Sequence, residues 1–302
     1  MNWFWIALIG PFLWSVGNHL DKYLLSKYFK NTGIGALIIF SSLIGVVILP
    51  IILLFQADVF SLSLIQAIVI MLAGVSVTTG LLIYLYALEH DEASIVASLF
   101  QAIPVFGYIL GAIFLREFLN TYQIIGAVLI IGAGIAISWN IDTNKFKARI
   151  FWLMMIASLL IAIESLLFKI FALQTDFWTA SFWEYAGTGL LGAVLMFVTA
   201  YRREFLVLWK NYKIRLIALN SANEIMTVIG ILTSRFALLL APMALVQTVN
   251  GFQPFFVFLM GITLSFFFPK LGRESLQRRH LIQKIVAIII MIIGAYLIEH
   301  NN

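Results

Sequence analysis

Residues 33–55 have the sequence GIGALIIFSSLIGVVILPIILLF, which contains no charged side chain. The core of a bilayer is about 30 Å thick, and a helix of roughly 20 apolar residues crosses it. This stretch therefore predicts a transmembrane helix, and the composition suggests the same solvent for the whole chain. Of the 302 residues, 62% are hydrophobic and 11% are charged, and the mean hydropathy is +1.02. A soluble protein of this size could not keep so much apolar surface away from water.

Ten stretches of the chain are long and apolar enough to be spans, and together they predict an all-α membrane protein. They cover residues 2–21, 33–55, 63–88, 93–115, 121–140, 150–173, 177–200, 214–236, 242–268 and 282–298. The first stretch carries no Lys or Arg before it and no small-residue cleavage site after it, so we expect it to be a retained span and not a signal peptide.

The sequence also contains a weak internal repeat. A shift of 150 residues places Ala87, Leu88, Val96, Pro104, Phe106 and Gly111 on Ala237, Leu238, Val246, Pro254, Phe256 and Gly261. A shift of 147 places Phe4, Trp5 and Lys22 on Phe151, Trp152 and Lys169, and Ile130–Ala133 repeats at Ile292–Ala295. These matches predict a five-helix half at 1–140, a cytoplasmic linker at 141–149 and a second half at 150–302. An odd number of spans per half makes the halves antiparallel, with a central cavity between the inverted repeats.

The basic residues predict the orientation in the membrane. The segments 21–32, 145–149, 202–215 and 270–284 hold sixteen of the 19 Lys and Arg residues. The opposite side has three, which are Arg116, Lys169 and Arg235. The positive-inside rule then places both termini outside the cytoplasm. The net charge of +5 and the pI of about 9.4 reflect this bias and do not suggest nucleic-acid binding.

A further pattern runs through the third to fifth predicted spans and the first one. It consists of Ala87-Leu88, Ala93-Ser94, Pro104, Glu117, Gln123, Gly126 and Gly132, with Trp14-Ser15 and Lys22. The pattern resembles the EamA-type transporters of the drug/metabolite transporter superfamily. The resemblance implies ten helices, an inverted repeat and carriage of small metabolites. It also implies cytoplasmic termini, in disagreement with the charge count.

Three acidic residues lie well inside predicted spans: Glu164, Glu184 and Glu224. Ionisable groups in lipid are costly unless they face a cavity or a partner, so each is a candidate for substrate binding or proton coupling. Counted along their helices, the three could share one level. We expect no Lys or Arg at that depth, because Lys22 and Lys169 can extend to the interface from the helix ends. Unpaired carboxylates would favour a cation or a proton, unless each is only hydrogen-bonded to a neighbouring helix.

Polar side chains recur at helical spacing on three spans, and they could line a cavity or join helices. They are Asn220, Asn223, Glu224 and Thr227; Gln247, Asn250 and Gln253; and Ser94, Ser98 and Gln101. Asn18 and His19 lie in the inner half of the first span, where His19 is either a proton carrier or an interfacial residue.

Aromatic residues and prolines complete the candidates. Trp183 and Tyr185 flank Glu184, and rings beside a carboxylate can hold organic ammonium ions, although packing explains them equally well. Tyr84 could reach the same cavity. Pro104 and Pro254 lie in mid-span at repeat-equivalent positions and are either hinges or fixed kinks.

These features predict a secondary transporter for a small metabolite such as an amino acid or amine, acting by alternating access and coupled to protons. The alternative is a flippase or binding protein for a lipid-linked substrate. The chain has no cysteine and no phosphate-binding or metalloprotease motif, so we expect no catalytic residue, cofactor or metal. The expected partners are the substrate, membrane lipids and at most a second copy, and the expected location is a bacterial inner or plasma membrane.

Overall fold

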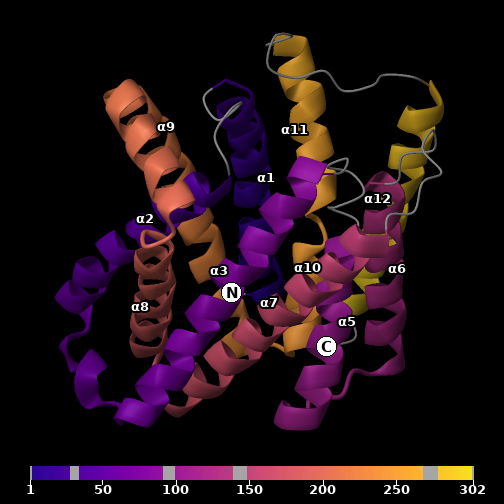
Figure 1. Ribbon diagram of the computed structural model, residues 1–302. Coiled ribbons are helices and arrows are strands. Elements are labelled where there is room, and N and C mark those ends of the chain that lie inside the picture. Colours follow the sequence, from indigo (N-terminus) through magenta and orange to yellow (C-terminus); the bar gives the residue numbers. More distant parts are fainter. Residues whose placement is uncertain (1, 28–33, 91–98, 139–147, 268–277, 301–302) are drawn as a thin grey trace.

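The computed structural model describes residues 2–27, 34–90, 99–138, 148–267 and 278–300, and these are helical without a strand (Figure 1). The first half contains α1 (Trp3–Lys27), α2 (Ile34–Phe55), η1 (Ala57–Ser61), α3 (Leu64–His90), η2 (Phe100–Ala102), α5 (Ile103–Leu110), η3 (Gly111–Leu115) and α6 (Thr121–Ser138). The second half contains α7 (Ala148–Gln174), α8 (Phe177–Leu195), α9 (Thr199–Leu240), α10 (Met243–Asn250), α11 (Gln253–Phe267) and α12 (Arg278–His300). The predicted all-α class is confirmed.

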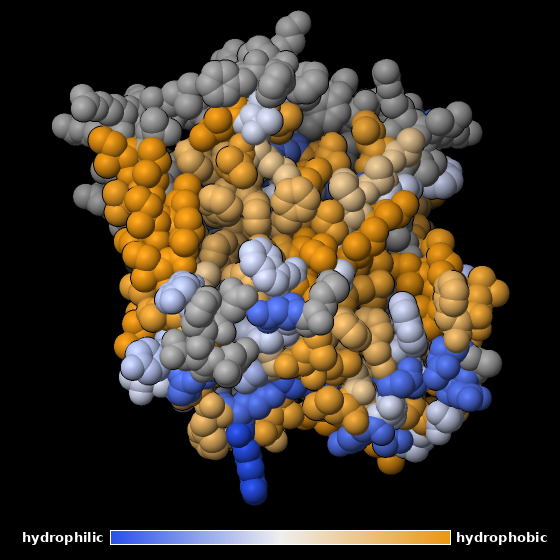
Figure 2. Space-filling view, turned by 180° about the vertical axis from the view of Figure 1, so that it is seen from behind, coloured by the Kyte–Doolittle hydropathy of each residue, from blue (hydrophilic) through white to orange (hydrophobic). Residues whose placement is uncertain are grey.

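Five segments of these helices are long and apolar enough to cross a membrane: Ile34–Phe55, Leu64–Ala87, Ala148–Gln174, Ala218–Leu240 and Met243–Leu264. Apolar side chains also cover most of the middle of the face shown in Figure 2, and hydrophilic residues gather along its lower edge. Such a surface suits a protein whose sides contact lipid and whose ends contact water. The chain is therefore a membrane protein with several candidate spans, while the total of ten remains a prediction.

The helices pack in a small set of pairs. α1 lies along α9, and α3 lies along α7 and α8. α2 contacts both α8 and α9, and α5 contacts α7 and α10. α6 and α12 form a further close pair, seen side by side at the right of Figure 1, and α6 also contacts α10 and α11.

The pairing of α6 with α12 depends on glycine. A Cβ atom at Gly126 would lie 2.6 Å from the carbonyl oxygen of Gly294, and one at Gly294 would lie 2.8 Å from that of Gly126. Only residues without a side chain allow such a close approach of two helix backbones. Gly132, which the sequence match aligned with Gly294, has open space instead. The contact therefore uses the earlier Ile-Ile-Gly-Ala sequence at 124–127.

Both prolines predicted to be hinges or kinks lie where a span divides into two helical segments. Pro104 lies in the first turn of α5, after the 3₁₀ turn η2. Pro254 is the second residue of α11, after the break that separates it from α10. Proline suits the first turn of a helix because the N–H that it lacks would have no partner there. Both prolines thus lie inside a predicted span where it divides, and their role as hinges or as fixed kinks stays a prediction.

The basic segment 202–215, expected to be a loop, is part of the long helix α9. Arg, Lys, Leu and Glu are good helix formers, so charge alone does not end a helix. Aromatic packing also holds this segment. The ring centroid of Phe40 on α2 lies 4.9 Å from that of Phe205 and 6.2 Å from that of Trp209.

Candidate functional site

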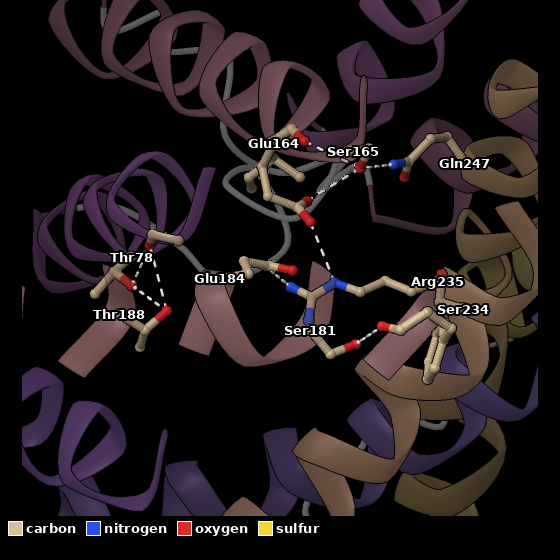
Figure 3. Close-up of polar contacts among 12 residues, drawn as sticks. Thr78, Glu164, Ser165, Ser181, Glu184, Thr188, Ser234, Arg235 and Gln247 are labelled. Atoms are coloured by element: carbon tan, nitrogen blue, oxygen red, sulfur yellow. Dashed lines mark hydrogen bonds and ion pairs between the residues drawn. The ribbon is translucent and has the colours of Figure 1, made fainter. Parts of the chain in front are cut away.

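Three helices of the second half bring two acidic side chains and one basic side chain together (Figure 3). Glu164 comes from α7, Glu184 from α8 and Arg235 from α9. The Nε atom of Arg235 donates to Oε1 of Glu164 at 3.2 Å, and its Nη2 atom pairs with Oε1 of Glu184. All three residues are buried. The result is a triad of charges in the interior of the helix bundle.

Two aromatic rings also face the guanidinium. The Cζ atom of Arg235 lies 5.2 Å from the ring centroid of Phe168 and 5.5 Å from that of Tyr185. Phe168 is one helical turn after Glu164, and Tyr185 directly follows Glu184. At these distances the electron-rich faces of the rings attract a cation.

A chain of polar side chains connects the triad to α10. The hydroxyl of Ser165 donates to Oε2 of Glu164 at 3.1 Å and accepts from Nε2 of Gln247 at 2.6 Å. Asn250 donates to Oε1 of Gln247 at 3.3 Å and to the hydroxyl of Ser234 at 3.1 Å. The amides predicted to line a cavity, Gln247 and Asn250, thus belong to the same network as the two acids.

The triad is not balanced. Two carboxyl groups face one guanidinium, which leaves one negative charge if all three are ionised. In addition, Oε2 of Glu184 and Nη1 of Arg235 have no hydrogen-bond partner among the described residues. Buried groups in this condition are costly, and they mark places where a proton, water or ligand fits. The arrangement can therefore accept one further positive charge.

The presence of Arg235 corrects the expectation that no basic residue lies at the depth of the acids. The predicted span 214–236 places Arg235 near its end, on the side opposite the basic loops. The structure continues α9 to Leu240, so Arg235 lies inside the helix and is only 5% exposed.

Lys169 is also buried and does not extend to the interface as expected. It forms an ion pair with Glu117 and donates to the carbonyl oxygen of Ala241 at 2.6 Å. The other oxygen of Glu117 accepts from the backbone N–H of Met243 at 2.7 Å. This second ion pair joins α7 to the segment after η3, and the two hydrogen bonds connect both to the start of α10. With Lys169 and Arg235 inside the bundle, two of the three charges assigned to the opposite side are not loop charges.

Glu224 does not join the triad. It precedes Arg235 by 11 residues on the continuous helix α9, which corresponds to about 16 Å. Its carboxyl accepts a hydrogen bond from Ser41 on α2. Asn220, one turn earlier, is 1% exposed, and its amide atoms have no partner among the described residues. The expectation of one three-acid cluster is thus corrected, and Glu224 and Asn220 form a separate polar region.

The remaining candidates of the first half lie elsewhere. His19 contacts the carbonyl oxygen of Val257 at 3.0 Å through Nε2, and Asn18 beside it is half-buried. Tyr84 stacks on Phe100 with 4.7 Å between ring centroids. The structure therefore does not bring these three side chains to the triad.

Gln101 and Trp183 have local packing roles. Gln101 is buried, and its amide fills the space left by Gly134 and Gly251. Nε1 of Trp183 donates to the carbonyl oxygen of Val59 at 2.7 Å, which ties α8 to η1. Ser94 and Ser98 lie outside the described residues.

The described part of the chain has grooves away from the triad. One, of about 300 Å³, is lined by Ile6, Phe177, Trp178, Leu232, Thr233 and Phe236, and the other, of about 400 Å³, lies along the start of α9. These two grooves contain no residue of the triad, and the central cavity stays a prediction. The described residues contain no group of three His, Cys, Asp or Glu that could hold a metal ion.

Comparisons with known sequences and structures concern the family and the fold. Residues 1–139 match the EamA-like transporter family, of the drug/metabolite transporter superfamily. No curated protein matches the chain. One solved structure with a similar fold, described only as the crystal structure of a protein, has 13% identity and a TM-score of 0.68. The alignment covers 98% of this chain and 95% of that one, and at this identity it shows the fold alone. The resemblance to the EamA-like transporter family is therefore confirmed over residues 1–139, and it indicates a membrane transporter of the drug/metabolite type.

Proposed function

We propose that the protein is a secondary transporter that moves a small metabolite, with amines and amino acids as the favoured classes, by alternating access between two inverted five-helix halves. The halves are residues 1–140 and 150–302, joined by a linker at 141–149 on the cytoplasmic side. The protein would act in a bacterial cell membrane as a monomer or homodimer. Members of the matching family are transporters, in agreement with the absence of an enzyme motif in the sequence.

The helix pairs support the repeat. Suppose that α1, α2, α3, α5 and α6 correspond to α7, α8, α9, α10–α11 and α12. The pair α1–α9 then corresponds to α7–α3, and the pair α2–α9 to α8–α3, and all four contacts are present. In the pairs α2–α8, α5–α10 and α6–α12, the proposed two-fold rotation exchanges the two helices, as expected for helices next to the axis. An inverted repeat explains this reciprocal pattern, and transporters use such repeats to alternate between two openings.

The single observation that carries the proposal is the buried triad of Glu164, Glu184 and Arg235. Charges inside a membrane protein are expensive, and they are found where substrates or protons pass. The hydrogen-bonded amides of Gln247 and Asn250 extend the triad towards α10 with groups that can contact a polar substrate. The surplus carboxyl would bind either a proton or a cationic group of the substrate. This competition would couple proton movement to substrate movement.

The test is uptake of metabolites by proteoliposomes that contain the purified protein, with and without a pH gradient. We expect saturable flux that depends on the gradient, and loss of this dependence in Glu164→Gln and Glu184→Gln. The matched control is Glu204→Gln, since Glu204 lies on α9 outside the triad. Absence of flux for all amines and amino acids, with binding of lipid head groups, would reject the proposal in favour of a lipid-linked substrate.

A further inference from the structure

Four side chains from two helices surround the guanidinium of Arg235, and we refer to them as the cage. Glu164 and Phe168 come from α7, and Glu184 and Tyr185 come from α8. All four are buried, with exposed fractions of 5% or less. The occupant itself belongs to a third helix, α9.

The cage has the chemistry of a site for an organic cation. Two carboxylates provide charge and hydrogen-bond acceptors, at 3.2 Å in the case of Glu164. Two ring faces, with centroids 5.2 Å and 5.5 Å from the Cζ atom, provide cation–π attraction. Anionic ligands are disfavoured, because the cage walls carry only negative charge.

We propose that the cage is a binding site for a guanidinium or primary ammonium group of a small organic cation, and that Arg235 occupies it in the conformation described here. A cargo cation binds by taking the place of Arg235. This inference rests on the proposed transport function for its physiological meaning, but the binding step can be tested without transport.

The fit of Arg235 in the cage is incomplete, which favours exchange. Its Nη1 atom has no acceptor among the described residues, and Oε2 of Glu184 has no donor there. A free ligand can turn to satisfy groups that a side chain fixed to α9 cannot reach, and unsatisfied buried groups carry a desolvation cost. Departure of Arg235 would also remove the ion pairs that join α9 to α7 and α8, so ligand binding would loosen one helix from its neighbours.

Competition with an internal occupant predicts a specific order of affinities. The apparent affinity of a ligand falls by the fraction of molecules in which the site is open. Removal of the Arg235 side chain opens the cage in every molecule. The variant Arg235→Ala should therefore bind a guanidinium compound more tightly than the natural protein does.

The experiment measures the thermal unfolding of the purified full-length protein against increasing methylguanidinium chloride, with sodium chloride at equal concentration as reference. We expect Arg235→Ala to gain stability from methylguanidinium alone, with half-saturation at a concentration at least about tenfold lower than for the natural protein. The second substitution Glu184→Gln in this variant should weaken binding about tenfold, and Phe168→Leu should weaken it about fivefold by removing a ring face. The matched control is Arg202→Ala, which removes an exposed arginine from the same helix and should not gain binding.

Equal half-saturation for the natural protein and Arg235→Ala would overturn the proposal, as would equal stabilisation by sodium chloride. If Arg235→Ala is recovered in folded form only when methylguanidinium is present, that rescue supports the cage. If Arg235→Gln is folded and neither variant responds to the probe, the cage is rejected. Metabolite flux without methylguanidinium binding would reject the cage and support the transport proposal. Methylguanidinium binding without metabolite flux would support the cage and reject the transport proposal.

Discussion

Removal of the charge of Arg235 is expected to destabilise the fold strongly. In Arg235→Met the stem and the approximate volume of the side chain remain, while Glu164 and Glu184 lose their only basic partner among the described residues. The three side chains are 6%, 6% and 1% exposed, so solvent screens these charges little. Breaking a buried ion pair by removal of one partner costs about 3–5 kcal/mol. For a chain of this size that corresponds to a fall in Tm of roughly 5–15 °C.

The assay is thermal unfolding of the purified protein in detergent at neutral pH, with recovery of monodisperse protein as the check on folding. The matched variant is the triple substitution Glu164→Gln, Glu184→Gln and Arg235→Met, which removes every charge and keeps the shapes. It should recover more than half of the lost stability, since neutral groups of similar volume can replace a buried charge network. If Arg235→Met lies within about 1 kcal/mol of the natural protein, the triad does not contribute to stability as an ion pair and the reasoning fails.

Three further predictions concern positions outside the triad. Gly126→Ala should lower the Tm, because the added Cβ would lie 2.6 Å from a carbonyl oxygen of α12. The control Gly132→Ala should leave the Tm unchanged, because Gly132 has open space around it. Equal Tm values for the two variants would refute the close packing of α6 and α12. Although partial burial acts to raise it, hydrogen bonds from neighbouring groups hold the pKa of Asp176 below its usual value. Its contribution is therefore fully present above about pH 4 and is lost progressively as the pH falls through the lowered pKa. Asp176→Ala should cost about 1 kcal/mol at pH 7 and progressively less as the pH is lowered below about 4, measured by thermal unfolding across this range. Glu117→Gln should lower the free energy of unfolding by about 3 kcal/mol, because it leaves Lys169 buried without a carboxylate. A second substitution, Lys169→Met, should restore most of this loss in the same assay. A lack of recovery would show that the two residues act through other contacts.

Much of the helical architecture could be predicted from the sequence, because long apolar runs in a chain of this composition have few alternatives to membrane helices. The starts of α2, α3 and α6 lie within a residue or two of the predicted ranges. The differences concern charged residues near the ends of predicted spans. The basic segment 202–215 was assigned to a loop although its residues favour a helix, and Arg235 was assigned to a span end although α9 continues past it.

The triad itself was only half visible in the sequence. Glu164 and Glu184 were recognised as candidates because an acid inside an apolar run is conspicuous by itself. Their cation was missed because pairing between α7, α8 and α9 is a tertiary contact, with 71 and 51 residues between the partners. Glu224 looked the same in sequence as the other two acids, and only the packing of α9 against α2 separates it from them.

The proposed internal repeat points to the site from the sequence alone. The shift of 150 residues that aligns Ala87 with Ala237 places Arg235 opposite Leu85, and the shift of 147 that aligns Lys22 with Lys169 places Glu164 opposite Gly17. Under the proposed repeat, Arg235 and Glu164 have no charged counterpart at these positions of the first half. Groups that serve packing in an inverted repeat are expected in both halves, because both halves must fold in the same way. Charges present in one half only need another reason, and a ligand that lacks two-fold symmetry supplies one.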